Sequence, residues 1–189
     1  MIDIDHFEKS LEVLQQGGTI LFPTDTIWGI GCDATNESAV DKVYSLKKRD
    51  KSKPLIVLAS DIEMVKEYVI NVHPKLETLL QYHTRPITVI YDHQHGLPKN
   101  VISKDNTIGI RIPQDVFCRE LIKSFGKPIV ATSANISNEA FPKNFGEITS
   151  NVIAKVDFTI PYRQNDSNFL PPSTIVRLSS NDELIFLRE

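Results

Sequence analysis

One segment of the sequence carries cations at a spacing that could bind a phosphorylated ligand. Lys47 and Arg49 lie two residues apart in the run 47–53, which holds five cations in seven residues. Cations make strong charge-assisted hydrogen bonds with phosphate oxygens. A solvated helix end, where the macrodipole favours cations, is the more common role of such a run. A second segment, 131–135, offers hydroxyl and carboxamide groups after an apolar stretch, although these residues also occur in ordinary turns.

Three further segments offer hydroxyl groups or a guanidinium for a small polar ligand. Segment 22–31 places two threonines, an aspartate and a tryptophan directly after an apolar stretch. It lacks the Gly-Lys-Ser/Thr ending of a phosphate loop, so we expect a recognition loop or a tight turn. Arg111 alternates with isoleucines on an expected strand, where it could hold a carboxylate or serve the structure. Ser173 and Thr174 begin the last apolar segment.

The sequence has no arrangement typical of a nucleophilic enzyme or a metal site. No Ser-His-Asp order and no paired catalytic carboxylates are apparent, so we predict no catalytic side chain. His93 and His95 have no Cys or acidic partner at metal-ligand spacing, and we expect no metal site. Cys32 and Cys118 form no disulfide framework, and we expect both to be buried apolar residues in a reducing compartment.

The elements that must position these side chains alternate between helix and strand. Amphipathic spacing and capping residues predict the helices, and short apolar runs predict the strands. The expected helices span 5–16, 37–47, a segment that begins at 60, 74–82, 114–125 and 145–152. The expected strands span 19–22, 54–58, 87–91, 107–112, 128–131, 156–160 and a terminal hairpin of 173–178 with 183–188. This order predicts an α/β fold with a twisted mixed sheet and flanking helices, with ligands beyond the carboxyl ends of strands.

The composition is that of one globular domain, residues 1–189. The chain is 41% hydrophobic and 24% charged, which excludes a disordered, collagen-like or coiled-coil protein. Its net charge of −3 argues against nucleic-acid binding over the whole surface but allows a local basic patch. The acidic N-terminus lacks a signal-peptide pattern, and no apolar run approaches about 18 residues. We therefore expect no membrane association and a cytoplasmic location.

Taken in order along the chain, these segments resemble the YrdC/TsaC-like family of threonylcarbamoyl-AMP synthases. The motifs that carry the resemblance are Pro23-Thr-Asp-Thr26 with Gly29 and Gly31, Lys47-x-Arg49 with Lys53-Pro-Leu55, Thr107-x-x-x-Arg111-x-Pro113, Ser133-Ala-Asn135 and Ser173-Thr174. The resemblance covers about residues 8–178. It implies a single YrdC-like domain with a concave, positively charged face.

The resemblance also implies a reaction and its participants. L-threonine and bicarbonate would combine as a carbamate, which would attack the α-phosphate of ATP to give threonylcarbamoyl-AMP and pyrophosphate. Mg2+ would accompany the ATP. Partner proteins would pass the threonylcarbamoyl group to an adenosine beside the anticodon of tRNA. Because the attacking group is already an anion, the chemistry needs alignment and fixed charge rather than a side-chain nucleophile.

The resemblance assigns the residues to two ends of one site. Those expected to bind ATP are Lys47, Arg49, Thr107, Ser133 and Asn135. Those expected to bind threonine are Thr26, Arg111 and Ser173. Within these sets, Lys47 and Arg49 would hold the phosphates, and Arg111 would hold the threonine carboxylate.

Some positions depart from the family pattern. Trp28 stands where a tyrosine is usual, and Leu58 where many members have a histidine. His83-Thr-Arg-Pro86 replaces a Trp-Pro-Gly-Pro stretch and is expected to bring Arg85 near the site, and Val176-Arg177 stands where an aspartate often follows. Because a mixed anhydride hydrolyses readily, the site should exclude water, and loop 161–172 is the expected cover.

Two other functions fit the same residues. A YciO-like protein could use the basic concavity to bind structured RNA, such as tRNA or double-stranded RNA, without this activity. Such binding would weaken steeply with salt. An enzyme of the same chemistry could instead act on another amine than threonine.

Overall fold

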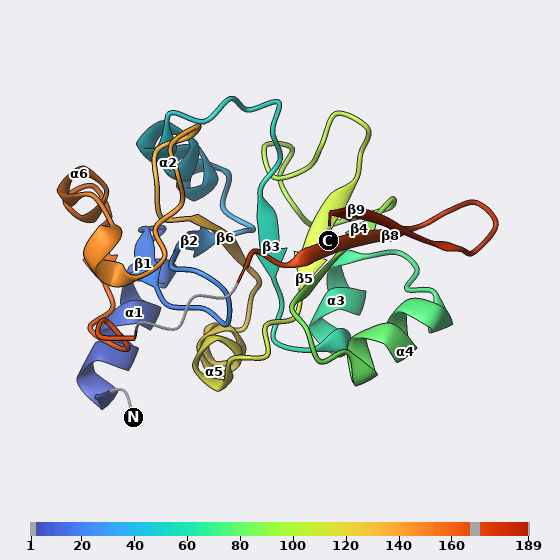
Figure 1. Ribbon diagram of the computed structural model, residues 1–189, viewed down its shortest axis with the longest axis horizontal. Coiled ribbons are helices and arrows are strands. Elements are labelled where there is room, and N and C mark those ends of the chain that lie inside the picture. Colours follow the sequence, from blue (N-terminus) through green and yellow to red (C-terminus); the bar gives the residue numbers. More distant parts are fainter. Residues whose placement is uncertain (1–2, 167–170, 189) are drawn as a thin grey trace.

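The computed structural model describes residues 3–166 and 171–188 of the chain. Its strands form one nine-stranded mixed sheet in the order β7-β1-β2-β6-β3-β5-β4-β8-β9. Figure 1 shows helices α1, α5, α3 and α4 along the lower side of the view and α2 on the upper side. The α/β architecture with a mixed sheet and flanking helices is therefore confirmed.

The helices and strands have the following bounds. The helices are α1 (Ile4–Gln15), α2 (Glu37–Lys47), α3 (Ile62–Tyr68), α4 (Pro74–Tyr82), α5 (Val116–Phe125), the 3-10 turn η1 (Phe145–Glu147) and α6 (Ser150–Ile153). The strands are β1 (Ile20–Phe22), β2 (Gly29–Asp33), β3 (Ile56–Leu58), β4 (Ile87–Tyr91), β5 (Ile108–Arg111), β6 (Ile129–Ser133), β7 (Phe158–Thr159), β8 (Thr174–Leu178) and β9 (Leu184–Arg188). No described helix combines the length and apolar character that crossing a membrane would require.

The helix ends follow the local chemistry of the sequence. The Asn36 side chain accepts a hydrogen bond from the Ala39 amide at the start of α2, and Asp115 caps α5 through the Cys118 amide. Each such cap stabilises a helix by about 1 kcal/mol. Gly126 ends α5 with a φ of 74°, a left-handed conformation that glycine adopts at little steric cost.

Alternation along the central strands divides the sheet into a core face and an open face. Val57, Ile110 and Val130 point into the hydrophobic core and are almost fully buried. Each such side chain stabilises the fold by about 1.5–3 kcal/mol. Their strand neighbours Ile56 and Ala131 point the other way, because successive residues of a strand face opposite sides of a sheet. This second face forms the floor of a cavity.

Three sequence predictions about elements were wrong. Segment 22–31 is not a continuous loop, because its second part is strand β2, paired with β1 and β6. Gly31 permits this pairing, since a Cβ there would lie 2.6 Å from the Val130 carbonyl oxygen. The helix expected over 145–152 is divided into η1 and α6. Strand β6 continues two residues beyond 131, so that Ser133 belongs to the sheet.

Candidate functional site

A cavity of about 390 Å³ lies on the open face of the central strands. Its floor is made by side chains from alternate positions of β3, β5 and β6: Ile56, Leu58, Gly109, Arg111, Ala131 and Ser133. Gly109 and Ala131 keep the middle of the floor low because they have little or no side chain. The volume suits a small ligand.

Strand register places two polar groups at opposite ends of this floor. Arg111 lies beside Leu58, which pairs with Ile129 of β6. Ser133 lies four residues beyond Ile129 on the same strand. Four residues of strand span about 13 Å. The cavity therefore has one end at Arg111 and another at Ser133, separated by roughly the length of an amino acid joined to a phosphate.

The Arg111 guanidinium dominates the first end. It is 6% exposed, donates from Nη1 to the Thr26 hydroxyl at 3.0 Å, and forms an ion pair through Nη2 with Asp25. Its Nε is buried and has no hydrogen-bond partner among the described residues. Burial lowers the pKa of Arg111 to about 10, and the nearby Arg188 guanidinium also lowers it. Because this pKa is still well above 7, Arg111 remains charged at neutral pH. A carboxylate is a fitting ligand for this group.

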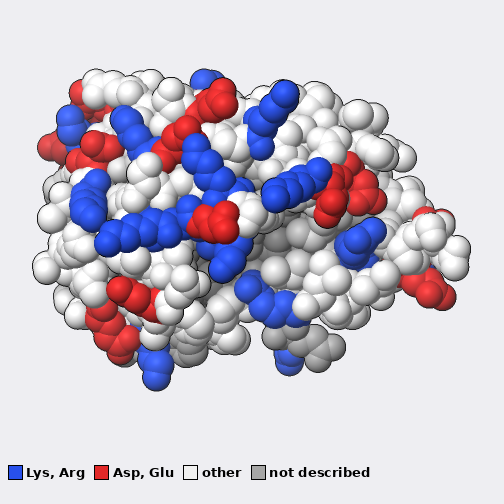
Figure 2. Space-filling model, turned by 90° about the horizontal axis from the view of Figure 1, so that it is seen from above, with Lys and Arg blue, Asp and Glu red and all other residues white. Residues whose placement is uncertain are grey.

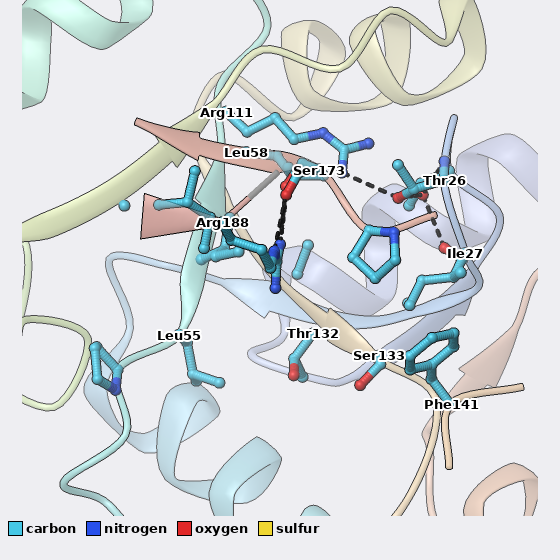
Figure 3. A pocket seen from close by; sticks show the side chains of 18 of the residues that line it. Thr26, Ile27, Leu55, Leu58, Arg111, Thr132, Ser133, Phe141, Ser173 and Arg188 are labelled. Carbon is cyan, nitrogen blue, oxygen red and sulfur yellow. Dashed lines mark hydrogen bonds between the residues drawn. The ribbon is translucent and has the colours of Figure 1, made fainter. Parts of the chain in front are cut away.

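A second guanidinium reaches the same end from the last strand. Arg188 donates from Nη2 to the Ser173 carbonyl oxygen at 2.6 Å, and the Ser173 hydroxyl lies 2.7 Å from the hydroxyl of Thr88. Figure 3 shows Arg111 of β5, Arg188 of β9 and Ser173, which directly precedes β8, converging on the cavity. Two cations with a hydroxyl between them form a site for an anion.

The segment that carries Thr26 is held by hydrogen bonds at both ends. The Cys118 thiol donates to the Pro23 carbonyl oxygen at 3.1 Å, as expected of a buried cysteine. Thr24 and Thr26 share a hydrogen bond of 3.0 Å between their hydroxyls, and Thr24 donates to the Ile27 carbonyl oxygen. Thr26 therefore faces the cavity with a fixed hydroxyl.

The end of α2 separates its two cations. Lys48 adopts a left-handed conformation, with φ 49° and ψ 40°, and turns the chain between Lys47 and Arg49. Arg49 lines the cavity, and its guanidinium donates to the carbonyl oxygens of Lys53 and Pro54 at 3.0 Å each. The group is partly exposed, so its remaining N–H donors can reach a ligand at the Ser133 end.

Lys47 is buried beside the cavity and does not line it. Its Nζ donates to the carbonyl oxygens of Ser133 at 2.5 Å and Asn135 at 2.6 Å, and to Asn135 Oδ1 at 3.1 Å. Burial lowers the pKa of Lys47 to about 7, while the three oxygens around Nζ favour its charged form. The phosphate contact expected for Lys47 stays a prediction, since in the structure its ammonium braces the loop after β6.

Ser133 and Asn135 are joined to each other. The Ser133 hydroxyl donates to Asn135 Oδ1 at 2.5 Å, and Asn135 Nδ2 donates to the Glu139 carbonyl oxygen at 2.7 Å. Ser133 lines the cavity, whereas Asn135 is not among the lining residues. Asn135 thus fixes the serine hydroxyl at the end of the floor.

Thr107 lies at the edge of this region rather than in it. Its hydroxyl lies 2.8 Å from that of Ser103, and it does not line the cavity. Strands β3 and β5 are parallel, and Ile56 pairs with Gly109. Thr107 lies two residues before Gly109, and Pro54 lies two residues before Ile56, so Thr107 and Pro54 are at the same end of the two strands. The register therefore puts Thr107 at the same end as Arg49, and its nucleotide contact stays a prediction.

Of the positions that depart from the family pattern, some line the cavity and others lie away from it. Leu58 lines the floor beside Arg111, and Trp28 lines the wall, with its ring 4.9 Å from that of Phe145. Arg85, expected near the site, is exposed and does not line the cavity. The expected cover 161–172 lies partly outside the described residues. Of its described part, Tyr162 and Arg163 line a second cavity across segment 24–28, and Pro172 lines the first.

Figure 2 shows lysine and arginine side chains gathered around a hollow in the face seen from above, with a few acidic groups between them. Among the described residues that line the main cavity, the charged ones are Arg49, Arg111 and Arg188. The net charge of −3 is therefore unevenly distributed, with positive charge at the cavity. Such an arrangement attracts anionic ligands.

Sequence reasoning missed Arg188 and Asp25. Arg188 lies 77 residues from Arg111 in the chain, and only the register of the terminal hairpin, which pairs it with Ile175, brings it to the cavity. The sequence presents Asp25 only as one polar residue of its segment, and nothing local indicates that its carboxylate pairs with Arg111. The turn that predicts the terminal hairpin could have placed Arg188 beside Ile175. The pairing of Asp25 with Arg111 could not be predicted in this way, because it depends on how two distant segments pack together.

The described residues offer no ready-made metal site. No group of three or more His, Cys, Asp or Glu side chains within 3–166 and 171–188 could hold a metal ion. The main cavity also lacks a carboxylate among its described lining residues. Mg2+ prefers carboxylate and phosphate oxygens, so in this cavity it fits only as part of a bound phosphate ligand.

Comparison with known sequences gives consistent matches over most of the chain. The family model for Sua5, YciO and YrdC, described as telomere recombination, matches residues 12–189. A protein of Methanocaldococcus jannaschii, named provisionally as a threonylcarbamoyl-AMP synthase, is 34% identical over 186 residues, which are 96% of this chain and 86% of that protein. The threonylcarbamoyl-AMP synthase of Vibrio parahaemolyticus is 33% identical over 137 residues, 71% of this chain and 74% of its own.

Solved structures share the fold. Sua5 of P. abyssi complexed with L-threonine superposes with a TM-score of 0.87 at 22% identity, covering all of this chain and 55% of Sua5. The chain thus spans about half the length of that protein. HypF in a phosphate- and nucleotide-bound form has a TM-score of 0.83 at 25% identity, covering 97% of this chain and 28% of HypF. YciO of E. coli has a TM-score of 0.81 at 21% identity, covering 99% and 90%.

Proposed function

The chain belongs to the Sua5/YciO/YrdC family, and from that premise we propose that it is an L-threonylcarbamoyladenylate synthase. One observation supports this most strongly. Arg49, Arg111 and Ser133, expected to act together on the sequence alone, line one cavity on one face of the sheet. The names of the relatives from M. jannaschii and V. parahaemolyticus point to the same reaction.

The proposed reaction joins three substrates. The amino group of L-threonine takes up bicarbonate as a carbamate, with loss of water. A carbamate oxygen then attacks the α-phosphorus of ATP, and the bond from that phosphorus to the bridging oxygen breaks. The products are threonylcarbamoyl-AMP and pyrophosphate, so that the enzyme is a nucleotidyltransferase.

The amino acid fits the Arg111 end of the cavity. The threonine carboxylate would bind the Arg111 guanidinium, whose orientation Thr26 and Asp25 fix. The carbamate would lie toward Arg188 and the Ser173 hydroxyl, because its negative charge needs a second cation. Leu58 and Trp28 would provide the apolar contact for the threonine methyl group.

ATP fits the other end. Its phosphates would meet the partly exposed Arg49 guanidinium and the Ser133 hydroxyl, which would turn from Asn135 Oδ1 to donate to a phosphate oxygen, while Lys47 holds the end of β6 and the loop after it. Mg2+ would arrive with ATP as part of the substrate. About 13 Å between the two ends allows the carbamate to reach the α-phosphate while the carboxylate stays on Arg111.

Catalysis in this arrangement depends on alignment and fixed charge. The carbamate oxygen is already a nucleophile, so no side chain has to accept a proton or form a covalent intermediate. Binding both reactants in one cavity removes the entropic cost of their encounter, which can be worth about 7–11 kcal/mol. The guanidiniums stabilise the charge that develops on the phosphate oxygens.

The RNA-binding alternative is not favoured. The cavity holds buried, oriented polar groups at its floor, such as Arg111, whereas phosphate contacts to RNA need only exposed cations. Transfer of the threonylcarbamoyl group to tRNA by partner proteins, direct contact with tRNA and a cytoplasmic location stay predictions.

Pyrophosphate release tests the proposed function. The purified protein should release pyrophosphate from ATP only when threonine and bicarbonate are both present. Serine and other amino acids, offered in parallel, test whether the amine is threonine. Release that does not depend on threonine, or RNA binding without affinity for ATP, would contradict the proposal.

A further inference from the structure

Thr88 of β4 carries a buried hydroxyl group beside the cavity. The residue is 0% exposed and does not line the cavity, but its hydroxyl lies 2.7 Å from the hydroxyl of Ser173, which does. Thr88 pairs with Arg111 of β5, so both side chains are on the open face of the sheet. Strand β8, which Ser173 directly precedes, pairs with the other edge of β4. Ser173 therefore connects the buried Thr88 hydroxyl to the Arg111 end of the cavity.

Burial decides which of these two hydroxyls donates the hydrogen bond. If Ser173 donated, the Thr88 proton would be fully buried with no acceptor among the described residues, which is unfavourable. Thr88 is therefore the donor and Ser173 the acceptor. A serine hydroxyl has one proton and two acceptor positions, and Arg188 Nη2 lies within reach of the second, at 3.4 Å (Figure 3). With both acceptor positions occupied, the Ser173 proton is left to point into the cavity.

We propose that Thr88 is a positioning residue that makes Ser173 a hydrogen-bond donor to the carbamate. This inference rests on the proposed function, which places the carbamate at Arg188 and Ser173. The carbamate oxygens carry its negative charge and accept hydrogen bonds, so a Ser173 hydroxyl that turned a lone pair toward them would repel them. A donor on one oxygen also orients the other toward the α-phosphate. Thr88 itself touches no substrate and acts only through the direction of the Ser173 hydroxyl.

The experiment compares variants with and without the Thr88 hydroxyl in pyrophosphate release, with threonine, bicarbonate and ATP varied in turn. Thr88→Val keeps the shape of the side chain but removes the hydroxyl. It should raise the KM for threonine and for bicarbonate by about three- to tenfold, the effect of one oriented hydrogen bond, and leave the KM for ATP within about twofold. Thr88→Ser, which keeps the hydroxyl, should stay near wild type. Thr88→Ala is a second hydroxyl-free variant, for use if Thr88→Val does not unfold cooperatively.

Two further proteins separate this role from a structural one. In a Ser173→Ala background, Thr88→Val should cause no further rise in either KM, because Thr88 acts through the Ser173 hydroxyl. Thr19→Val is the matched control, since Thr19 is 2% exposed, its hydroxyl donates to Asp157 at 2.9 Å, and it does not line the cavity. It should lower Tm without changing the KM of any substrate.

Several outcomes would overturn the inference. An active wild type matched by a folded Thr88→Val protein in every KM would show that the hydroxyl does not orient Ser173. Equal losses in Thr88→Ser or Thr19→Val would show a general effect on the fold, and a loss that adds to that of Ser173→Ala would show that Thr88 acts by another route. A wild type that releases no pyrophosphate with all three substrates would instead contradict the proposed function, and this inference with it.

Discussion

Replacing Lys47 and Arg49 separately by methionine should separate two roles that the Lys-x-Arg motif combines. Lys47 is 1% exposed, and its ammonium has three oxygen acceptors on Ser133 and Asn135. Lys47→Met leaves two partly buried carbonyl oxygens without this donor, at a cost of about 1–3 kcal/mol each, partly offset because a charge no longer has to be buried. The net loss should be about 3 kcal/mol in the free energy of unfolding, or about 10 °C in Tm.

Arg49→Met should behave in the opposite way. The Arg49 guanidinium is partly exposed and, within the described part of the chain, donates to two carbonyl oxygens of the next loop, so the free energy of unfolding should fall by about 1 kcal/mol or less. The loss of its charged hydrogen bonds to phosphate should weaken ATP binding by about 1.5–3 kcal/mol, which is roughly 10–150-fold in Kd.

Urea unfolding followed by Trp28 fluorescence measures the first effect, and calorimetric titration with ATP measures the second. Lys47→Met should shift the unfolding midpoint with an unchanged m-value. A Lys47→Met protein as stable as the wild type but unable to bind ATP would refute the reasoning. It would mean that Lys47 contacts the phosphates and that its brace to the loop after β6 carries no stability.

Further predictions concern the threonine end, the sheet and pH. Arg111→Lys should raise the Kd for threonine about tenfold or more, because an ammonium cannot bond Thr26, Asp25 and a carboxylate in one plane, while the Kd for ATP in the same titrations changes little. An equal loss for both ligands would argue against a separate amino acid end. In urea unfolding, Gly31→Ala should lower the free energy of unfolding by about 2 kcal/mol or more, since its Cβ would lie 2.6 Å from the Val130 carbonyl oxygen. Gly126→Ala should lower it by about 1 kcal/mol, because its Cβ would have no atom within 4 Å and only the positive φ of 74° is unfavourable. The folded pKa of Lys47, about 7, lies below that of an unfolded lysine, so the unfolded chain binds more protons between about pH 7 and 10.5. The free energy of unfolding should therefore rise with pH across that range in the wild type relative to Lys47→Met, and a parallel pH dependence in the two proteins would contradict it.

The sequence predicts most of the fold because its signals are local. The Asn36 cap, the proline at the start of α4 and the glycine after α5 mark helix ends with little help from distant parts of the chain. The terminal hairpin is likewise predicted by its turn. Strand β2 was missed because its residues, Gly29–Asp33, look like a loop on their own and become a strand only between β1 and β6.

The sequence motifs select part of the cavity lining but not its geometry, because Lys47, Thr107 and Asn135, also expected in the site, do not line the cavity. The motifs identify Arg49, Arg111 and Ser133, which do line one cavity. They do not indicate that Lys47 is buried and bonded to the loop after β6, since spacing alone cannot tell an exposed cation from a buried one. Arg188 reaches the cavity only through hairpin pairing, which depends on long-range register.

A crystal structure with threonine and a non-hydrolysable ATP analogue tests the central claim most directly. The threonine carboxylate should lie within hydrogen-bond distance of Arg111, and the phosphates should lie between Arg49 and Ser133 in the same cavity. Threonine bound instead in the cavity across segment 24–28, beside Arg163 and Asp166, would contradict the account.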